Sequence, residues 1–260
     1  MPFNMVGFAE ALPGTGTQPI AVGLGEDLYT VVGDDILVTK QAPYVLGMMA
    51  WAVGTGGRMI LRQPKMIDYD NHKVSLIADV APKCGSTELF ARPLPLRVDR
   101  LGALIINAVD EDTILGVLLG SGKITQAMKD AVNPTHKITG FSDQLIVANT
   151  WTPCAVTWNE TLDAGIYEIV GMRGVCYGAA ALNAALMRLR IPGSMSWRPG
   201  VPCGYGGAAH LEWQGMYDFP FKDWPAMGIR FDTQHMPNIE VLSCGAHTDE
   251  DVELTLQKVG

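Results

Sequence analysis

Apolar and polar residues alternate in many short segments of this chain, which is the pattern of β-strands with one buried face. The clearest example is the C-terminal stretch 252–259, where apolar residues alternate with Glu253, Thr255 and Gln257. Short strands are also expected within LYTVV, DILVT, KVSLIADV and QLIVANT, which are separated by Gly, Pro, Asn or Asp. Only two segments favour short helices, residues 124–132 and the Ala/Leu-rich stretch 178–186. The pattern therefore predicts an all-β fold with one or two short helices.

The hydrophobic segments of the first half recur, in the same order, in the second half. Each match is short, but four matches in register favour an internal duplication over coincidence. We therefore expect residues 34–120 to superpose on residues 143–260, with Tyr44 on Tyr167 and Arg62 on Arg190. The matched pairs are 34–38 with 143–147, Tyr44…Met48 with Tyr167…Met172, 61–64 with 189–192, and 110–113 with 249–252.

The positions of the repeats and linkers predict four parts. Residues 1–25 are rich in Gly, Pro and Thr, and we expect an extended N-terminal arm outside either core. Residues 26–121 form the first β-unit, residues 122–140 a linker with a short helix, and residues 141–260 the second β-unit. Many short strands per unit are typical of jelly rolls and β-sandwiches, so we predict two tandem, duplicated units of that kind.

Charge argues against one class of function. The net charge is −8 and no run of Lys or Arg occurs, so a basic groove for nucleic acid is not expected. The N-terminus lacks the basic and apolar regions of a secretory signal, and no apolar stretch is long enough to span a bilayer. We therefore expect a soluble chain without direct, sequence-specific contact with nucleic acid.

The five cysteines are widely spaced and include no C-x-x-C pair, which argues against a zinc ribbon. An odd number of cysteines also argues against a complete disulfide framework. Buried free thiols, made in a reducing compartment, are the expected state. The cysteines are Cys84, Cys154, Cys176, Cys203 and Cys244.

The histidines do not form a compact metal-binding cluster. The nearest approach is His210 with Glu212, which would share one strand face and be joined by His235 or His247. Residues 68–71, DYDN, could offer oxygen ligands to calcium but do not fit an EF-hand, so an ordinary polar turn is favoured. No phosphate loop, nucleophile elbow or Cys–His pair is evident. We therefore predict no catalytic, cofactor-binding or metal residues.

Aromatic residues gather late in the chain, between Trp197 and Trp224. Such a loop can bind sugar, pack its aromatic side chains into a small hydrophobic core of its own, or contact another subunit. Interfaces are enriched in Trp, Tyr and Met, and subunit contact is favoured over sugar binding. The cluster comprises Trp197, Tyr205, Trp213, Tyr217, Phe219, Phe221 and Trp224.

A tandem of two β-units, an N-terminal arm and no catalytic cluster resembles the double jelly-roll major capsid proteins of tailless icosahedral viruses. The resemblance is architectural, covers about residues 26–260, and concerns a chain short for that family. It implies a structural protein and not an enzyme: a homotrimer that forms a pseudo-hexameric capsomer and then a shell.

The resemblance also implies that the chain is made in the host cytoplasm and resides in the virion, with other virion proteins and membrane contact left open. Two alternatives remain. One is a bicupin-type metal-dependent enzyme using His210, Glu212 and a later histidine. The other is a tandem β-sandwich that binds carbohydrate or acts as an adhesin through the late aromatics.

Overall fold

The computed structural model describes residues 3–52, 57–62, 75–77, 86–89, 96–107, 110, 112–121, 133–177, 185–193, 197–205 and 229–260. Across these ranges every regular element is a β-strand and no helix is present. The all-β prediction is therefore confirmed. The helix expected at 124–132 lies outside the described residues, as does most of the one expected at 178–186, whose last two residues belong to a strand.

Residues 3–120 form two antiparallel sheets. In one sheet β1 pairs with β11, β11 with β5, and β5 with β8 and β9. In the other sheet, β10 pairs with β6, β2 and β4. β7 pairs with the far edge of β6, and β3 pairs with β4. The bounds are β1 Phe3–Glu10, β2 Gly16–Ile20, β3 Thr30–Val32, β4 Asp35–Leu37, β5 Tyr44–Ala52, β6 Gly57–Arg62, β7 Ser75–Ile77, β8 Ser86–Leu89, β9 Leu96–Arg97, β10 Arg100–Asn107 and β11 Thr113–Gly120.

Residues 136–258 form one strongly curled sheet made of two runs. In the first run β12 pairs with β20, β20 with β15, and β15 with β18, while β14 lies on the edge of β12. In the second, β13 pairs with β19, β19 with β16, and β16 with β17. A short parallel pairing of β17 with β15 joins the runs. The bounds are β12 His136–Ser142, β13 Thr152–Cys154, β14 Thr157–Trp158, β15 Ile166–Tyr177, β16 Ala185–Arg190, β17 Gly200–Tyr205, β18 Ile229–Asp232, β19 Asn238–Ser243 and β20 Asp249–Lys258.

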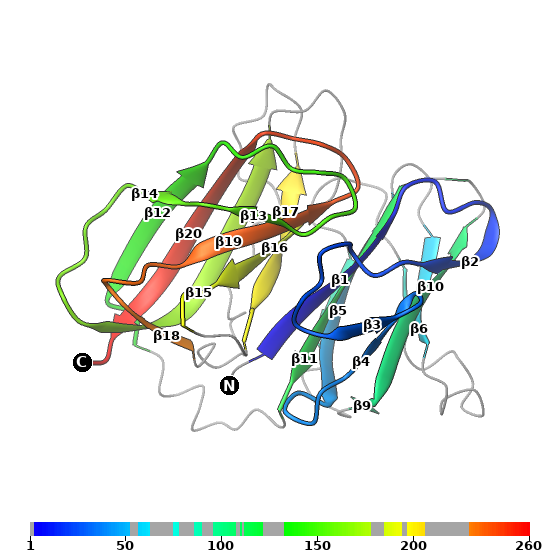
Figure 1. Ribbon diagram of the computed structural model, residues 1–260, viewed down its shortest axis with the longest axis horizontal. Helices are drawn as coiled ribbons and strands as arrows, with labels where there is room; N and C mark the ends of the chain where they lie inside the picture. Colours follow the sequence, from blue (N-terminus) through cyan, green and yellow to red (C-terminus); the bar gives the residue numbers. More distant parts are fainter. Residues whose placement is uncertain are drawn as a thin grey trace.

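The two halves lie side by side, with β1 next to the second half (Figure 1). Alternate residues of β1 point to different cores: Val6 and Phe8 pack between the two sheets of the first half, whereas Phe3 and Met5 pack against the second half. The β1–β11–β5 sheet is therefore buried on both faces. This explains why β5 and β11 read as almost continuous apolar runs and not as alternating ones.

The N-terminal segment is a correction to the sequence-based expectation. Residues 1–25 were expected as an extended arm outside either core, but β1 is a buried strand paired along its length with β11, and β2 pairs with β10. The physical reason is that both faces of β1 are covered, so its apolar residues show no alternation. Glycines and prolines in the following stretch mark turns and an edge strand, not a free arm.

The boundary after the linker also differs from the expectation. Residues 136–140 were assigned to a linker, but they begin β12, which pairs with β20. Four of the five cysteines are buried free thiols, as expected, and Cys84 lies outside the described residues. Among the residues that the structure describes, no helical segment has the length and hydropathy to cross a bilayer.

Candidate functional site

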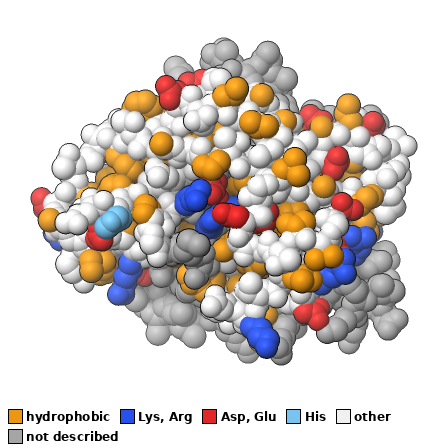
Figure 2. Space-filling model, viewed as in Figure 1, with side chains coloured by type: hydrophobic (Ala, Val, Ile, Leu, Met, Phe, Trp, Pro, Cys, Tyr) orange, Lys and Arg blue, Asp and Glu red, His pale blue; other side chains and the backbone are white. Residues whose placement is uncertain are grey.

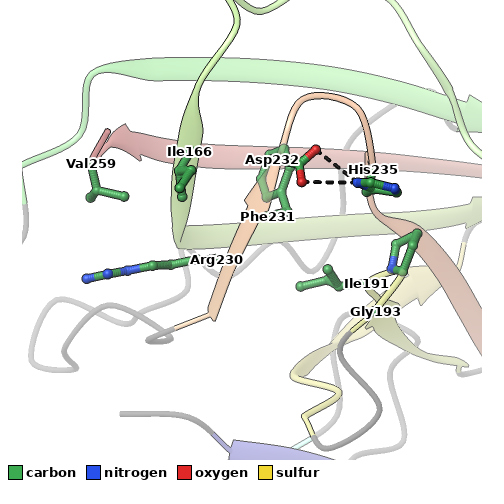
Figure 3. Close-up of a pocket in the computed structure, with 9 residues that line it drawn as sticks. Ile166, Ile191, Gly193, Arg230, Phe231, Asp232, His235 and Val259 are labelled. Carbon is green, nitrogen blue, oxygen red and sulfur yellow. Dashed lines mark hydrogen bonds and ion pairs between the residues drawn. The ribbon is translucent and has the colours of Figure 1, made fainter.

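A pocket of about 610 Å³ opens at one end of the second half. It forms where β15 begins, where β18 runs beside it, and where the chain leaves β16 and β20 (Figure 3). Its walls are largely apolar and its rim carries one cation and one acid–histidine pair. The lining residues are Ile166, Ile191, Pro192, Gly193, Arg230, Phe231, Asp232, His235 and Val259.

The polar groups of this pocket are held by local contacts. Nδ1 of His235 lies 3.0 Å from both carboxylate oxygens of Asp232, and the backbone N–H of Gln234 donates to Asp232 Oδ1 at 2.8 Å. The hydrogen bond from His235, followed by that from Gln234, holds the pKa of Asp232 below its usual range. Arg230 is paired with Glu168 on the neighbouring strand. Each polar group therefore already has a partner within the turn or sheet.

The described lining of this pocket is mostly apolar. None of its nine lining residues is a serine, threonine, cysteine or lysine. His235 is 58% exposed, so its pair with Asp232 stabilises a surface turn without the burial that tunes a catalytic base. The apolar residues Ile166 and Val259 are also substantially exposed. The pocket can accommodate an apolar peptide segment or side chain, with Arg230 and Asp232 at its edge.

A second group of titratable residues is buried at the opposite end of β15. Glu250 is fully buried and pairs in register with Cys176 on one side and Ser142 on the other. Its carboxylate lies 3.7 Å from Nε2 of His247. Burial raises the pKa of Glu250 to about 8, and burial also raises the pKa of the Cys176 thiol. Glu250, Cys176 and His247 are each at most 2% exposed.

The most extensive polar cluster joins the two halves. Arg188 is fully buried on β16 and donates to Glu240 at 2.7 Å, to the backbone oxygen of Met5 at 3.3 Å and to Glu26 at 2.6 Å. Its guanidinium also stacks on Trp151, 3.9 Å from the ring centroid. Charges of both halves thus neutralise one another at this junction. We call this set, with Arg190, Arg198 and Asp27, the junction cluster.

Part of the junction cluster reaches the surface. Figure 2 shows acidic and basic side chains meeting near the centre of this face. Arg198 pairs with Asp27 and with Glu240, and its backbone N–H donates to Asn4 on β1. The Asp27 hydrogen bond with Arg198 lowers the pKa of Asp27, so this carboxylate stays charged. The cluster holds β1 and the segment after β2 against β16 and β19.

The described residues do not test the metal set of the enzyme alternative, which needs His210, Glu212 and either His235 or His247. His235 lies beside the start of β15, whereas His247 lies beside Glu250 at the far end of that strand. His210 and Glu212 lie outside the described residues, as do residues 68–71. Among the described residues, no group of three or more His, Cys, Asp or Glu side chains could hold a metal ion.

Of the late aromatics, Trp197 is described: it is half-buried and packs against the cores of both halves. Tyr205 ends β17, and the other five lie outside the described residues. Sequence reasoning missed the junction cluster. Its signal was Arg188 and Arg190 within the apolar strand ALMRLR, where a charge must find partners if the strand is buried.

A scan of protein families finds none that matches this chain, and a search of curated proteins finds no matching sequence. The strand pairings, the junction and the pocket are therefore the observations on which a function can be argued.

Proposed function

We propose that this chain is the major capsid protein of a tailless icosahedral virus and that it is built from two duplicated jelly rolls. The observation that carries the proposal is the same nested strand pairing in both halves. A jelly roll is one long antiparallel hairpin wrapped into two sheets, so its first strand pairs with its eighth, its second with its seventh, and so on inward.

In the first half the nested pairs are β1–β11, β2–β10, β5–β9 and β6–β7. In the second half they are β12–β20, β13–β19, β15–β18 and β16–β17. Wrapping the hairpin into two sheets also brings non-nested strands together, and these pairs correspond in the two halves. β11–β5 and β10–β6 match β20–β15 and β19–β16. The two halves therefore share these pairings in the same chain order, which supports the same jelly-roll topology in each half.

A small irregularity adds support. The pairing of β5 with β11 shifts at Leu46, immediately before Gly47, and the pairing of β15 with β20 shifts at Val170, immediately before Gly171. Both bulges therefore fall directly before the Gly-Met of the matched sequence segments. Bulges are retained features of related sheets, and the same bulge at the same place favours a common origin for the two halves.

Duplication of this kind has a structural use in a shell. Three copies of a two-unit chain place six similar units around one axis, so a homotrimer fills a near-sixfold position. The junction cluster and the shared core hold the two units of each chain in one fixed relation. The chain would then act as a self-assembling, non-enzymatic subunit of the virion, made in the host cytoplasm. The late aromatics are proposed as contacts between chains.

Light scattering on the purified full-length chain, combined with electron microscopy, tests this proposal. The expected mass is three times the 28.0 kDa of one chain, and concentrated samples should contain ring-shaped trimers or closed shells. A chain that stays monomeric at high concentration, without particles, would contradict it. Elemental analysis addresses the enzyme alternative: one transition metal per chain, lost on His210→Ala, would favour the bicupin.

A further inference from the structure

We propose that the outer face of the β4–β10–β6 sheet binds a second copy of this chain, through the acidic segment that follows β14 in the second half of that copy. The inference rests on the proposed function and names its subunit interface. It is argued from the contact already made between the two halves of one chain, which supplies a template for the contact between chains.

At the junction, the second half presents the outer face of β16 and β19, with Arg188, Arg190 and Glu240. The first half meets this face with β1 and with the segment after β2, which carries Glu26 and Asp27. The chain reaches this position because Val22 returns to bridge Phe8 on β1. A basic sheet face thus receives an acidic segment that lies alongside the first strand of the neighbouring unit.

The first half has a matching basic sheet face. β6 and β10 occupy the places of β16 and β19, and β4 also pairs with β10. Among the described residues, Arg62 and Arg100 both pair with the carboxylate of Asp35 on β4, at 2.5 and 2.7 Å. Asp35 is 4% exposed, but Arg62 and Arg100 are 40% and 39% exposed. Among these three described groups, two cations face one carboxylate, an excess of one positive charge. Apolar side chains that are also exposed lie on these and adjoining strands, namely Val32, Leu37 and Ile106.

The second half has a matching acidic segment. After β13 the chain returns to β12, where Trp158 pairs with Gly140 as Val22 does with Phe8. Glu160 follows and accepts hydrogen bonds from the backbone N–H of Thr139 at 2.6 Å and from its hydroxyl, so it lies along β12. Glu160 and Asp163 are both exposed. Phe141, at the end of the same strand, adds an exposed aromatic ring.

Charge therefore predicts which faces meet. Glu160 and Asp163 of one copy would approach Arg62 and Arg100 of the next, as Glu26 and Asp27 approach Arg188 and Arg198 within a chain. Exposed apolar residues on both sides would be covered by the same contact. The contact is head-to-tail, and repeating it gives a closed ring if the rotation between units closes.

Crosslinking between copies tests this pairing. Chains carrying Leu37→Cys are mixed with chains carrying Asp163→Cys during assembly and treated with a short bismaleimide. Both variants also carry Cys84→Ser, and the expected result is a covalent dimer in the mixture and none with either variant alone, since the other four native cysteines are buried. Trimers or shells that form without this crosslink would overturn the interface while leaving the proposed function standing. A wild-type chain that stays monomeric would overturn both.

Charge reversal gives an independent readout. Glu160→Lys/Asp163→Lys should weaken association at least tenfold in sedimentation velocity, because it places two cations against Arg62 and Arg100. Because Glu160→Lys also removes the hydrogen bonds from Thr139, Asp163→Lys alone is measured beside it, and this exposed single substitution should change the melting temperature little. The matched control is Asp110→Lys, an exposed acidic position in the first half outside the proposed contact. Unchanged association of the double variant, or equal weakening by the control, would contradict the proposed interface.

Discussion

At the scale of single residues, Arg188 illustrates what a linear sequence conceals. A buried arginine is tolerated only when an opposite charge pairs with it and its N–H groups have hydrogen-bond acceptors. The partners of Arg188, Glu26 and Glu240, lie far from it in the chain. The strand ALMRLR signals an unusual charge but not its partners. The burial of four cysteines followed from composition alone, because a free thiol packs as a small apolar group.

Replacement of Arg188 by methionine should lower the free energy of unfolding by about 3–5 kcal/mol, because Glu26 and Glu240 are then left buried without their cation. Urea denaturation of the variant and the wild type measures this difference. The matched control is Arg230→Met, which removes a 63% exposed arginine from its pair with Glu168 and should change stability by less than about 0.5 kcal/mol. Equal losses of unfolding free energy for the two substitutions would show that the junction cluster stabilises the fold no more than an exposed ion pair does.

Glu250 should make the stability of the fold depend on pH. Its pKa is raised by burial from 4.5 to about 8, so the folded chain retains a proton that the unfolded chain has lost. Stability from this group is complete below about pH 4.5 and is lost as pH rises through about 8. The wild type should therefore lose free energy of unfolding on the order of 4 kcal/mol between pH 5 and pH 9 through this group, and Glu250→Gln should not, so its melting temperature should fall less over this range.

The groups facing Glu250 bear on this experiment. Cys154, Cys176, Ser142 and His247 surround it, and Asp143, Asp249 and Asp251 add negative charge that raises its pKa further. Thermal melts of wild type and Glu250→Gln at pH 5, 7 and 9 measure the effect. Asp163→Asn, which neutralises an exposed carboxylate, serves as the control. Parallel pH profiles for wild type and Glu250→Gln would show that Glu250 is ionised in the fold.

At the scale of elements, strands with one solvent-facing side were predictable, and the doubly covered β5 and β11 were also expected as apolar strands, whereas the doubly covered β1 was not. β20 alternates and was expected, whereas β1 lacks alternation and was expected to be an arm. The difference is physical: the second face of β1 packs on the other half of the chain, and no local pattern encodes a contact with a distant unit. The metal set of the enzyme alternative stays untested, because His210 and Glu212 lie outside the described residues and only one of His235 and His247 was needed to complete it.

The close packing of β1 predicts a specific sensitivity at Gly7. A Cβ atom there would overlap Leu242 Cδ2 and approach Trp151 Cζ2 to 2.9 Å. Gly7→Val should therefore destabilise the fold by about 1–3 kcal/mol through overpacking between the halves. Thr17→Val, at an exposed position of β2, should be nearly neutral. Thermal melting compares them, and a neutral Gly7→Val would argue that the two halves do not pack tightly at β1.

At the scale of the whole molecule, the sequence repeat and the strand pairings bear on the same proposal from different directions. The four sequence matches supplied an expected register, and the bulges before Gly47 and Gly171 fall within that register. The side chains at the two outer sheet faces differ in kind. The β1–β11–β5 sheet uses apolar residues to bind its own second half, whereas β12 and β20 place Lys137, Thr139 and Glu253 on the corresponding face.

This difference suits a chain whose two halves must associate at once but whose copies must associate later. An apolar contact within one chain forms as it folds, whereas a charged contact between chains can respond to concentration and salt. The proposed capsid subunit would therefore keep a polar, soluble face until neighbouring copies are abundant. Low ionic strength should then strengthen association between copies without changing the fold of each chain.

Cryo-electron microscopy of the concentrated full-length protein tests the central proposal most directly. The account predicts a particle with threefold symmetry in which six similar β-units surround the axis, with unit–unit contacts alternating between the junction within a chain and the contact between chains. Class averages showing only isolated two-unit chains, or an oligomer in which the β-units do not form such a ring, would contradict it.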